Sequence, residues 1–160
     1  MNVYKSAISV NCTQFIVHRT NRRPGHIWKD EHVAQGFAWS DGSVSFGVPD
    51  HDGECLLEVD LVDELSELGP AVSWAVGVPF SAGSGLLKVG TVGIVAPIAI
   101  PAGDYGLAFL CFENFEVGDV LYPFRVIMAF IKRPKFSYAI LKSGPGLQTD
   151  RIQLERADPA

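Results

Sequence analysis

The chain has 160 residues, of which 48% are hydrophobic and 19% are charged, and its formal net charge is −5. This length and composition indicate one globular domain with a core of its own, and they exclude a disordered chain. The longest apolar run, residues 90–101, is far shorter than the roughly 20 residues of a membrane helix, and the N-terminus lacks the pattern of a secretory signal, so we expect a cytoplasmic protein without membrane contact.

Short runs rich in Val, Ile and Phe, separated by Gly, Pro, Asp and Ser, follow one another along the chain, which is typical of strands joined by turns. The predicted strands are residues 3–10, 14–19, 43–48, 54–62, 71–78, 86–92, 94–100, 105–112, 122–132 and 137–141. No helical pattern alternates with these strands. The sequence therefore predicts an all-β fold, a single-domain antiparallel β-sandwich, rather than a parallel α/β sheet.

Helical patterns are confined to one or two short turns. Residues 30–35 form the first candidate, with Asp30 as the N-cap and Gly36 ending the turn. Residues 63–68, followed by Gly69 and Pro70, form the second candidate. The sandwich domain is expected over residues 1–148, and the polar residues 149–160 are expected to form a loose C-terminal tail.

Charge is divided unevenly along the chain. Residues 1–29 contain five basic and no acidic side chains, whereas residues 30–67 contain eleven acidic side chains and no Lys or Arg. A block of this kind produces a negative field that reaches about 8 Å at physiological salt. Such a field repels nucleic acid and attracts a basic protein surface, for example that of a nuclease. The alternative is a merely solvated acidic face, tied internally to the basic N-terminal segment.

From this block we expect a protein partner and no direct contact with nucleic acid. We predict that eight carboxylates between residues 41 and 64 contact the partner. They are Asp41, Asp50, Asp52, Glu54, Glu58, Asp60, Asp63 and Glu64.

Patterns of catalytic or metal-binding residues are incomplete. Asp50, Asp52 and Glu54 alternate beside Gly53, as calcium ligands do, but the other ligands of a twelve-residue calcium loop are missing, and a polar turn between two strands explains them equally well. The histidines and cysteines are scattered, without zinc spacing or a CxxC pair. We therefore predict no catalytic residue, no metal, no cofactor and no enzymatic activity. Among the aromatic residues, Trp28 is the one expected to be partly exposed.

A set of short motifs runs from residue 8 to residue 112. They are Gln14-Phe15 with Val17, then Trp28 and Glu31, Gly36-Phe37-Ala38, Asp41-Gly42-Ser43-Val44-Ser45-Phe46, Val78-Pro79-Phe80 and Pro101-Ala102-Gly103-Asp104-Tyr105. In order and spacing they resemble the competence protein J family, small bacterial proteins that bind and inhibit a DNA-entry nuclease. The resemblance implies a proteinaceous, immunity-type inhibitor that neutralises a basic bacterial nuclease or nuclease toxin. The chain from about Phe115 lies outside this resemblance.

Two other functions remain open at this point. One is a β-sandwich module that binds a carbohydrate or another small ligand through exposed aromatic residues, with calcium as a possible companion. The other is a small hydrolase whose catalytic residues come together only in the folded chain.

Overall fold

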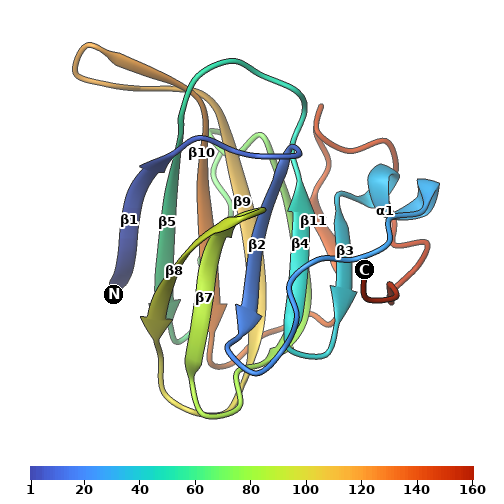
Figure 1. The fold of residues 1–160 in the computed structure, drawn as a ribbon. Coiled ribbons are helices and arrows are strands. Elements are labelled where there is room, and N and C mark those ends of the chain that lie inside the picture. The colour runs from blue at the N-terminus through green and yellow to red at the C-terminus, as the bar shows by residue number, and fades with distance from the viewer.

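The computed structural model describes residues 1–160 and contains two β-sheets packed face to face (Figure 1). The elements are β1 (Asn2–Ile8), β2 (Gln14–Arg19), α1 (Asp30–Gln35), β3 (Phe37–Ser40), β4 (Ser43–Gly47), β5 (Cys55–Val62), β6 (Trp74–Ser81), β7 (Leu86–Thr91), β8 (Ile94–Ala99), β9 (Asp104–Val117), β10 (Val120–Ile131) and β11 (Ala139–Lys142). The six-stranded sheet has the order β1-β5-β10-β9-β6-β11, and the five-stranded sheet has the order β3-β4-β2-β7-β8. The predicted all-β sandwich is confirmed.

Strand pairing departs from the prediction at one place. All neighbouring strands are antiparallel except β5 and β10, which run parallel from Leu56 beside Arg125 to Val62 beside Ile131. Two strands were longer than predicted, because β9 and β10 continue as a hairpin between residues 112 and 122. The six-residue α1 is too short to span a membrane, and the structure contains no helix that could do so.

The main core lies between the two sheets and is filled by aromatic rings. Phe46 of β4 and Phe109 of β9 stack across the interface with ring centroids 4.6 Å apart, and both are essentially fully buried. The other large, fully buried aromatic residues are Phe15, Phe37, Trp74, Phe80 and Phe130. Truncating a buried ring of this kind to alanine typically costs about 3–5 kcal/mol, so each of these rings contributes strongly to the stability of the sandwich.

A second apolar layer covers the outer face of the six-stranded sheet. It contains Val72, Ala75, Ala108, Leu110, Ala129 and Ile131, with Leu65 and Leu68 packed against them. Residues 63–68 are therefore not the predicted helical turn but part of an extended connection. The connection leaves β5 at one end of the sheet and must reach β6 near the other end. Residues 65–69 of this connection have no helical structure, and Leu65 and Leu68 pack on the outer face of the sheet.

Helix α1 covers the predicted residues 30–35, but its N-cap residue is Lys29 rather than Asp30. The backbone N–H of Lys29 donates to Nδ1 of His32 at 2.9 Å. Gly36 ends the helix with a φ of +82°, a conformation that favours glycine. The four-residue strand β3 follows at once and was missed, since its sequence is too short to show alternation.

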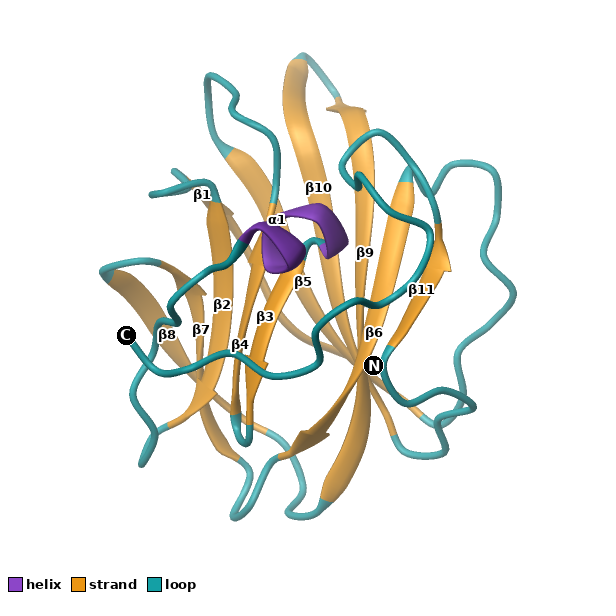
Figure 2. Ribbon diagram, turned by 90° about the vertical axis from the view of Figure 1, so that its right-hand side faces the viewer, coloured by secondary structure: helices purple, strands orange, loops and turns teal.

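The last twelve residues are not the loose tail that the sequence predicts. The buried side chain of Gln35 donates from Nε2 to the carbonyl of Leu154 at 2.6 Å and accepts from the N–H of Leu154 at 3.1 Å. Farther along, the N–H of Ala157 donates to the carbonyl of Trp39 at 2.8 Å. Figure 2 shows this segment passing α1 and crossing β3. A buried amide must be hydrogen-bonded, and here the C-terminal backbone supplies its partners.

Candidate protein-binding surface

Strand direction brings three separate segments to one end of the sandwich (Figure 1). The first is the β4–β5 connection, residues 48–54. Because β10 is parallel to β5, the hairpin that precedes β10 lies at the same end as this connection. Helix α1 lies there as well, because it leads into Phe37 of β3, which pairs with Phe46 just before β4 ends.

We call this region the acidic end, since eight exposed carboxylates are carried by these three segments. They are Asp30 and Glu31 in α1, Asp50, Asp52 and Glu54 in the β4–β5 connection, and Glu113, Glu116 and Asp119 in the hairpin. None of the eight forms an ion pair within the protein. The same segments carry one basic residue, Lys29 at the start of α1. These segments therefore carry a net negative charge, and none of their eight carboxylates is held in an internal ion pair.

The opposite end of the sandwich has acids as well, and three of them are paired, although the exposed Asp104 at the start of β9 is not. Asp41 lies 3.4 Å from the guanidinium of Arg19 and 3.5 Å from that of Arg22. Asp63 lies 3.6 Å from Lys132. In the same region Glu64 lies 3.4 Å from Arg133. These three predicted partner-binding residues are engaged in ion pairs with the basic residues around them.

Glu58 and Asp60 lie between the two ends, on the outer face of β5. Glu58 is only 8% exposed and forms an ion pair with Arg125, so its carboxylate has little surface to offer a partner. Asp60 is half-buried and accepts a hydrogen bond from Nδ2 of Asn2 at 3.0 Å. Of the eight predicted site residues, the fold thus gathers Asp50, Asp52 and Glu54 at the acidic end.

The three acids of the hairpin were missed as candidates. The sequence contained a signal for them, because Gly118-Asp119 between two valines is a typical hairpin turn, which would have joined the predicted strands 105–112 and 122–132. Joining the strands would have placed Glu113, Glu116 and Asp119 on one projecting element. These acids lie about fifty residues after the contiguous acidic block of residues 30–67, so the charge pattern along the chain does not connect them to it.

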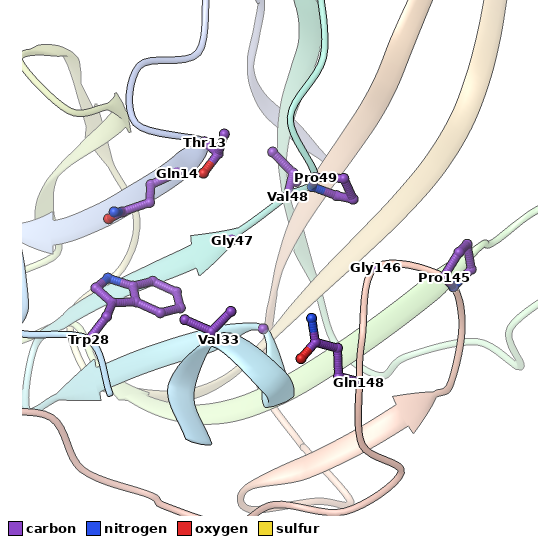
Figure 3. Close-up of a pocket in the computed structure, with 11 residues that line it drawn as sticks. Thr13, Gln14, Trp28, Val33, Gly47, Val48, Pro49, Pro145, Gly146 and Gln148 are labelled. Carbon is purple, nitrogen blue, oxygen red and sulfur yellow. The ribbon is translucent and has the colours of Figure 1, made fainter. Parts of the chain in front are cut away.

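A hollow of about 480 Å³ opens at the acidic end, between α1, the end of β4 and residues 145–148. Figure 3 shows Trp28, Val33 and Gln148 around it, with Gln14 on the opposite wall. Trp28 is half-buried, as predicted, and its buried indole Nε1 has no hydrogen-bond acceptor within the protein. The hollow therefore has an aromatic wall, and an indole N–H without an acceptor is buried beside it.

Asp50, Asp52 and Glu54 do not converge into a metal site. The structure contains no group of three or more His, Cys, Asp or Glu side chains arranged to hold a metal ion. The β4–β5 connection is instead a polar loop that passes from one sheet to the other, with a bend at Asp52 and Gly53, rather than the β-turn that the sequence suggested. The structure therefore offers no calcium site to support the alternative of a β-sandwich module that binds a small ligand together with calcium.

One cysteine–histidine contact resembles a catalytic pair, and its chemistry argues against that role. Sγ of Cys55 lies 3.2 Å from Nε2 of His51, whose Nδ1 donates to the carbonyl of Pro49 at 2.9 Å. With Nδ1 as donor, Nε2 accepts a hydrogen bond from the S–H group of Cys55. Burial raises the pKa of Cys55 to about 11, so the thiol stays protonated at neutral pH and supplies no thiolate nucleophile.

Comparison with known proteins identifies the family. The model of the competence protein J (ComJ) family matches residues 7–131, well over half of the chain, and it continues through the hairpin that lay outside the resemblance seen in the sequence. The crystal structure of ComJ from Bacillus subtilis, described as an inhibitor of the DNA-degrading activity of NucA, matches with a TM-score of 0.68. The match has 22% sequence identity and covers 82% of this chain and 96% of that chain, so it establishes a shared fold. No curated protein sequence matches. By the extent of the family match, the chain belongs to the competence protein J family.

Proposed function

We propose that this protein inhibits a bacterial DNA nuclease by binding it with the acidic end. The observation that carries the proposal is the group of eight exposed carboxylates, drawn from three segments and left without an internal cation. Membership of the competence protein J family supports it, because the solved ComJ is described as an inhibitor of NucA. We propose that the protein has no catalytic activity of its own.

The mechanism follows from the charge that a DNA nuclease needs. A cleft that attracts phosphates is rich in Lys and Arg, and an acidic protein surface competes for the same cations. Docking of the acidic end over that cleft would exclude DNA by occupying its entrance. Complementary charge also speeds association, and well-placed pairs at such interfaces have coupling energies of about 1.5–7 kcal/mol.

The hollow beside α1 suits an anchor of the nuclease. Val33 is 52% exposed on its rim, Trp28 forms a wall, and Asp30 and Glu31 stand on the same helix. Interfaces typically combine an apolar pocket near the centre with a charged rim. A Lys or Arg side chain could lay its aliphatic stem against Trp28 while its charged head turns towards Asp30 or Glu31 on the same helix.

The cytoplasm is the compartment we propose for this protein. Its three cysteines form no disulfide, and Cys55 and Cys111 are buried as thiols. Free buried thiols are usual where the surroundings are reducing.

The proposal is tested with the purified protein in a DNA-degradation assay. NucA of Bacillus subtilis and the NucA-type nuclease of the protein's own source serve as the two targets. We expect the wild type to inhibit at least the second enzyme, more strongly at low than at moderate salt. Inhibition of neither enzyme, together with no binding by calorimetry, would exclude this function.

A matched pair of charge variants then tests the surface. Asp50→Asn, Asp52→Asn and Glu54→Gln together remove three charges from the acidic end, whereas Asp41→Asn, Asp63→Asn and Glu64→Gln remove three from the opposite end. We expect the first variant to bind at least about tenfold more weakly, mainly through slower association, and the second to bind as the wild type does. Equal affinity of the two variants would show that the acidic end is not the docking surface.

A further inference from the structure

The β9–β10 hairpin extends beyond the rest of the six-stranded sheet. On one side, the pairing of β6 with β9 stops at Trp74 beside Cys111. On the other side, the pairing of β5 with β10 starts at Leu56 beside Arg125. Residues 113–124 therefore pair only with each other, and Figure 1 shows them projecting past the sandwich as a free two-stranded ribbon.

The local sequence builds this ribbon and marks where it leaves the sheet. Gly118, with a φ of +57°, is the first residue of a two-residue turn, the position that requires glycine in a type II′ hairpin. At the base, Asn114 has a φ of +50° and lies opposite Pro123, which has no N–H to donate. The ladder lacks a pair at that step. The tip, residues 115–122, is thus set apart from the sandwich by a local irregularity.

The tip exposes apolar side chains on both of its faces. Val117 and Val120 face each other across the strands and are 48% and 50% exposed. Leu121 pairs with Glu116, on the other face, and is 61% exposed. These three are among only nine large hydrophobic residues exposed on the whole molecule. Apolar side chains that stay exposed to water do little to stabilise a free two-stranded hairpin. Contact with another molecule would bury them, and this accounts for their presence at the tip.

The base of the hairpin is held firmly. The guanidinium of Arg125 lies 5.0 Å from the ring centre of Phe112 and 4.6 Å from that of Phe115. The same guanidinium forms the ion pair with the buried Glu58. Cation–π contacts and an ion pair on one planar group fix the direction in which the hairpin leaves the sandwich. A projecting element that is already oriented loses less entropy when it binds.

The negative charge of the tip indicates which kind of partner surface it can bind. Residues 112–124 contain Glu113, Glu116 and Asp119 and no basic side chain. Two copies of the hairpin packed tip to tip would bring six carboxylates together, which opposes self-association. A basic groove with apolar walls complements both properties of the tip, and the DNA cleft of a nuclease has the required charge.

We propose that the β9–β10 hairpin inserts into the DNA cleft of the nuclease partner, with Val117, Val120 and Leu121 against its walls and Glu116 and Asp119 beside its phosphate-binding cations. The hairpin would then block the cleft from inside, while the rest of the acidic end covers the entrance. This inference rests on the proposed inhibitor function and assigns the element that carries it out.

A matched pair of leucine substitutions tests the insertion. Leu121→Ser alters the tip, and Leu86→Ser alters a leucine that is 55% exposed at the start of β7, at the opposite end of the sandwich. Inhibition of the NucA-type nuclease and affinity are measured for both variants, with melting temperature as the check on folding. We expect Leu121→Ser to inhibit at least about tenfold more weakly and Leu86→Ser to stay within about twofold of the wild type.

A second variant and a cross-link keep the outcome decisive. Val117→Ser with Val120→Ser should weaken inhibition in the same way, and a photoreactive residue at position 121, but not at position 86, should cross-link to the nuclease. If the wild type inhibits and both tip variants inhibit equally well, the insertion is wrong while the inhibitor function stands. If the wild type itself neither binds nor inhibits, both proposals fall. Dissociation of a wild-type dimer by Leu121→Ser, seen by sedimentation, would also overturn the insertion, because the tip would then serve self-association.

Discussion

The two ends of the sandwich contain the same kinds of acidic residue and use them differently. At the opposite end, Asp41, Asp63 and Glu64 are each paired with a basic side chain. At the acidic end, eight exposed carboxylates have no such partner. The paired acids have their cations within the fold. The unpaired acids repel one another, which opposes folding slightly, and they are free to bind the cations of another molecule. The two ends therefore differ in how many of their acids are paired: none of the eight at the acidic end, and three at the opposite end, where Asp104 is unpaired.

The largest expected effect concerns the pair that lies between the ends. In Arg125→Met, the buried carboxylate of Glu58 loses its cation, and we expect the free energy of unfolding to fall by about 3 kcal/mol. Urea denaturation measures the change. Glu58→Met together with Arg125→Met should recover most of the loss, since no charge then remains buried. A single variant as stable as the wild type would contradict the structural role of the pair.

A pH change should act near the opposite end, where the C-terminal segment closes over His26. Its ring is hydrogen-bonded to the hydroxyls of Ser40 and Ser45, each at 2.9 Å. Burial, with a smaller contribution from the neighbouring His32, lowers the pKa of His26 to about 4 from 6.5. Above pH 6.5 His26 is neutral in both states. Below it the unfolded chain binds a proton first, so stability is lost as the pH falls from 6.5 towards 4.

For this single histidine the loss amounts to about 2 kcal/mol at pH 5. Denaturation curves at pH 7 and pH 5 measure it, and His26→Gln serves as the control. The variant should be less stable than the wild type at pH 7 but should lose less stability between the two pH values. An unchanged pH dependence in His26→Gln would assign the effect to other groups.

Neutralising a single acid should change the free energy of unfolding differently at the two ends. Asp41→Asn leaves Arg19 and Arg22 without their carboxylate, and because Arg19 is largely buried we expect a loss of about 1 kcal/mol. Asp52→Asn removes one of several like charges and should be neutral or slightly stabilising. The comparison is made by denaturation at low salt and repeated in 0.5 M salt, where the difference should shrink. Equal losses at both ends would contradict the distinction drawn between them.

The smallest expected effect is that of Trp28→Phe. The buried indole N–H has no acceptor, so its removal breaks no hydrogen bond, and the free energy of unfolding should change by no more than about 0.5 kcal/mol. If the hollow receives a polar group of the nuclease, the same variant should bind more weakly by several-fold. A large loss of stability would instead indicate a packing role for the indole.

Much of the architecture was predictable because it depends on local patterns. The runs of Val, Ile and Phe between turn residues predicted ten of the strands, and Gly36 correctly marked the end of α1. The elements that were missed have weak local signals. Strand β3 has four residues, and the extended connection after β5 was mistaken for a helical turn because Gly69 and Pro70 follow it, as such residues follow a helix end.

The candidate site was only partly predictable, because it is assembled across the chain. The sequence by itself determined that the protein is an all-β domain with a large excess of acid between residues 30 and 67. Only the tertiary structure decided which of those acids remain free, since ion pairs such as Asp63–Lys132 join residues about seventy positions apart. It also brought Glu113, Glu116 and Asp119 to the end that holds Asp50 and Asp52. The physical reason is that charges interact through space, and strand direction, which local sequence does not encode, sets which charges share an end.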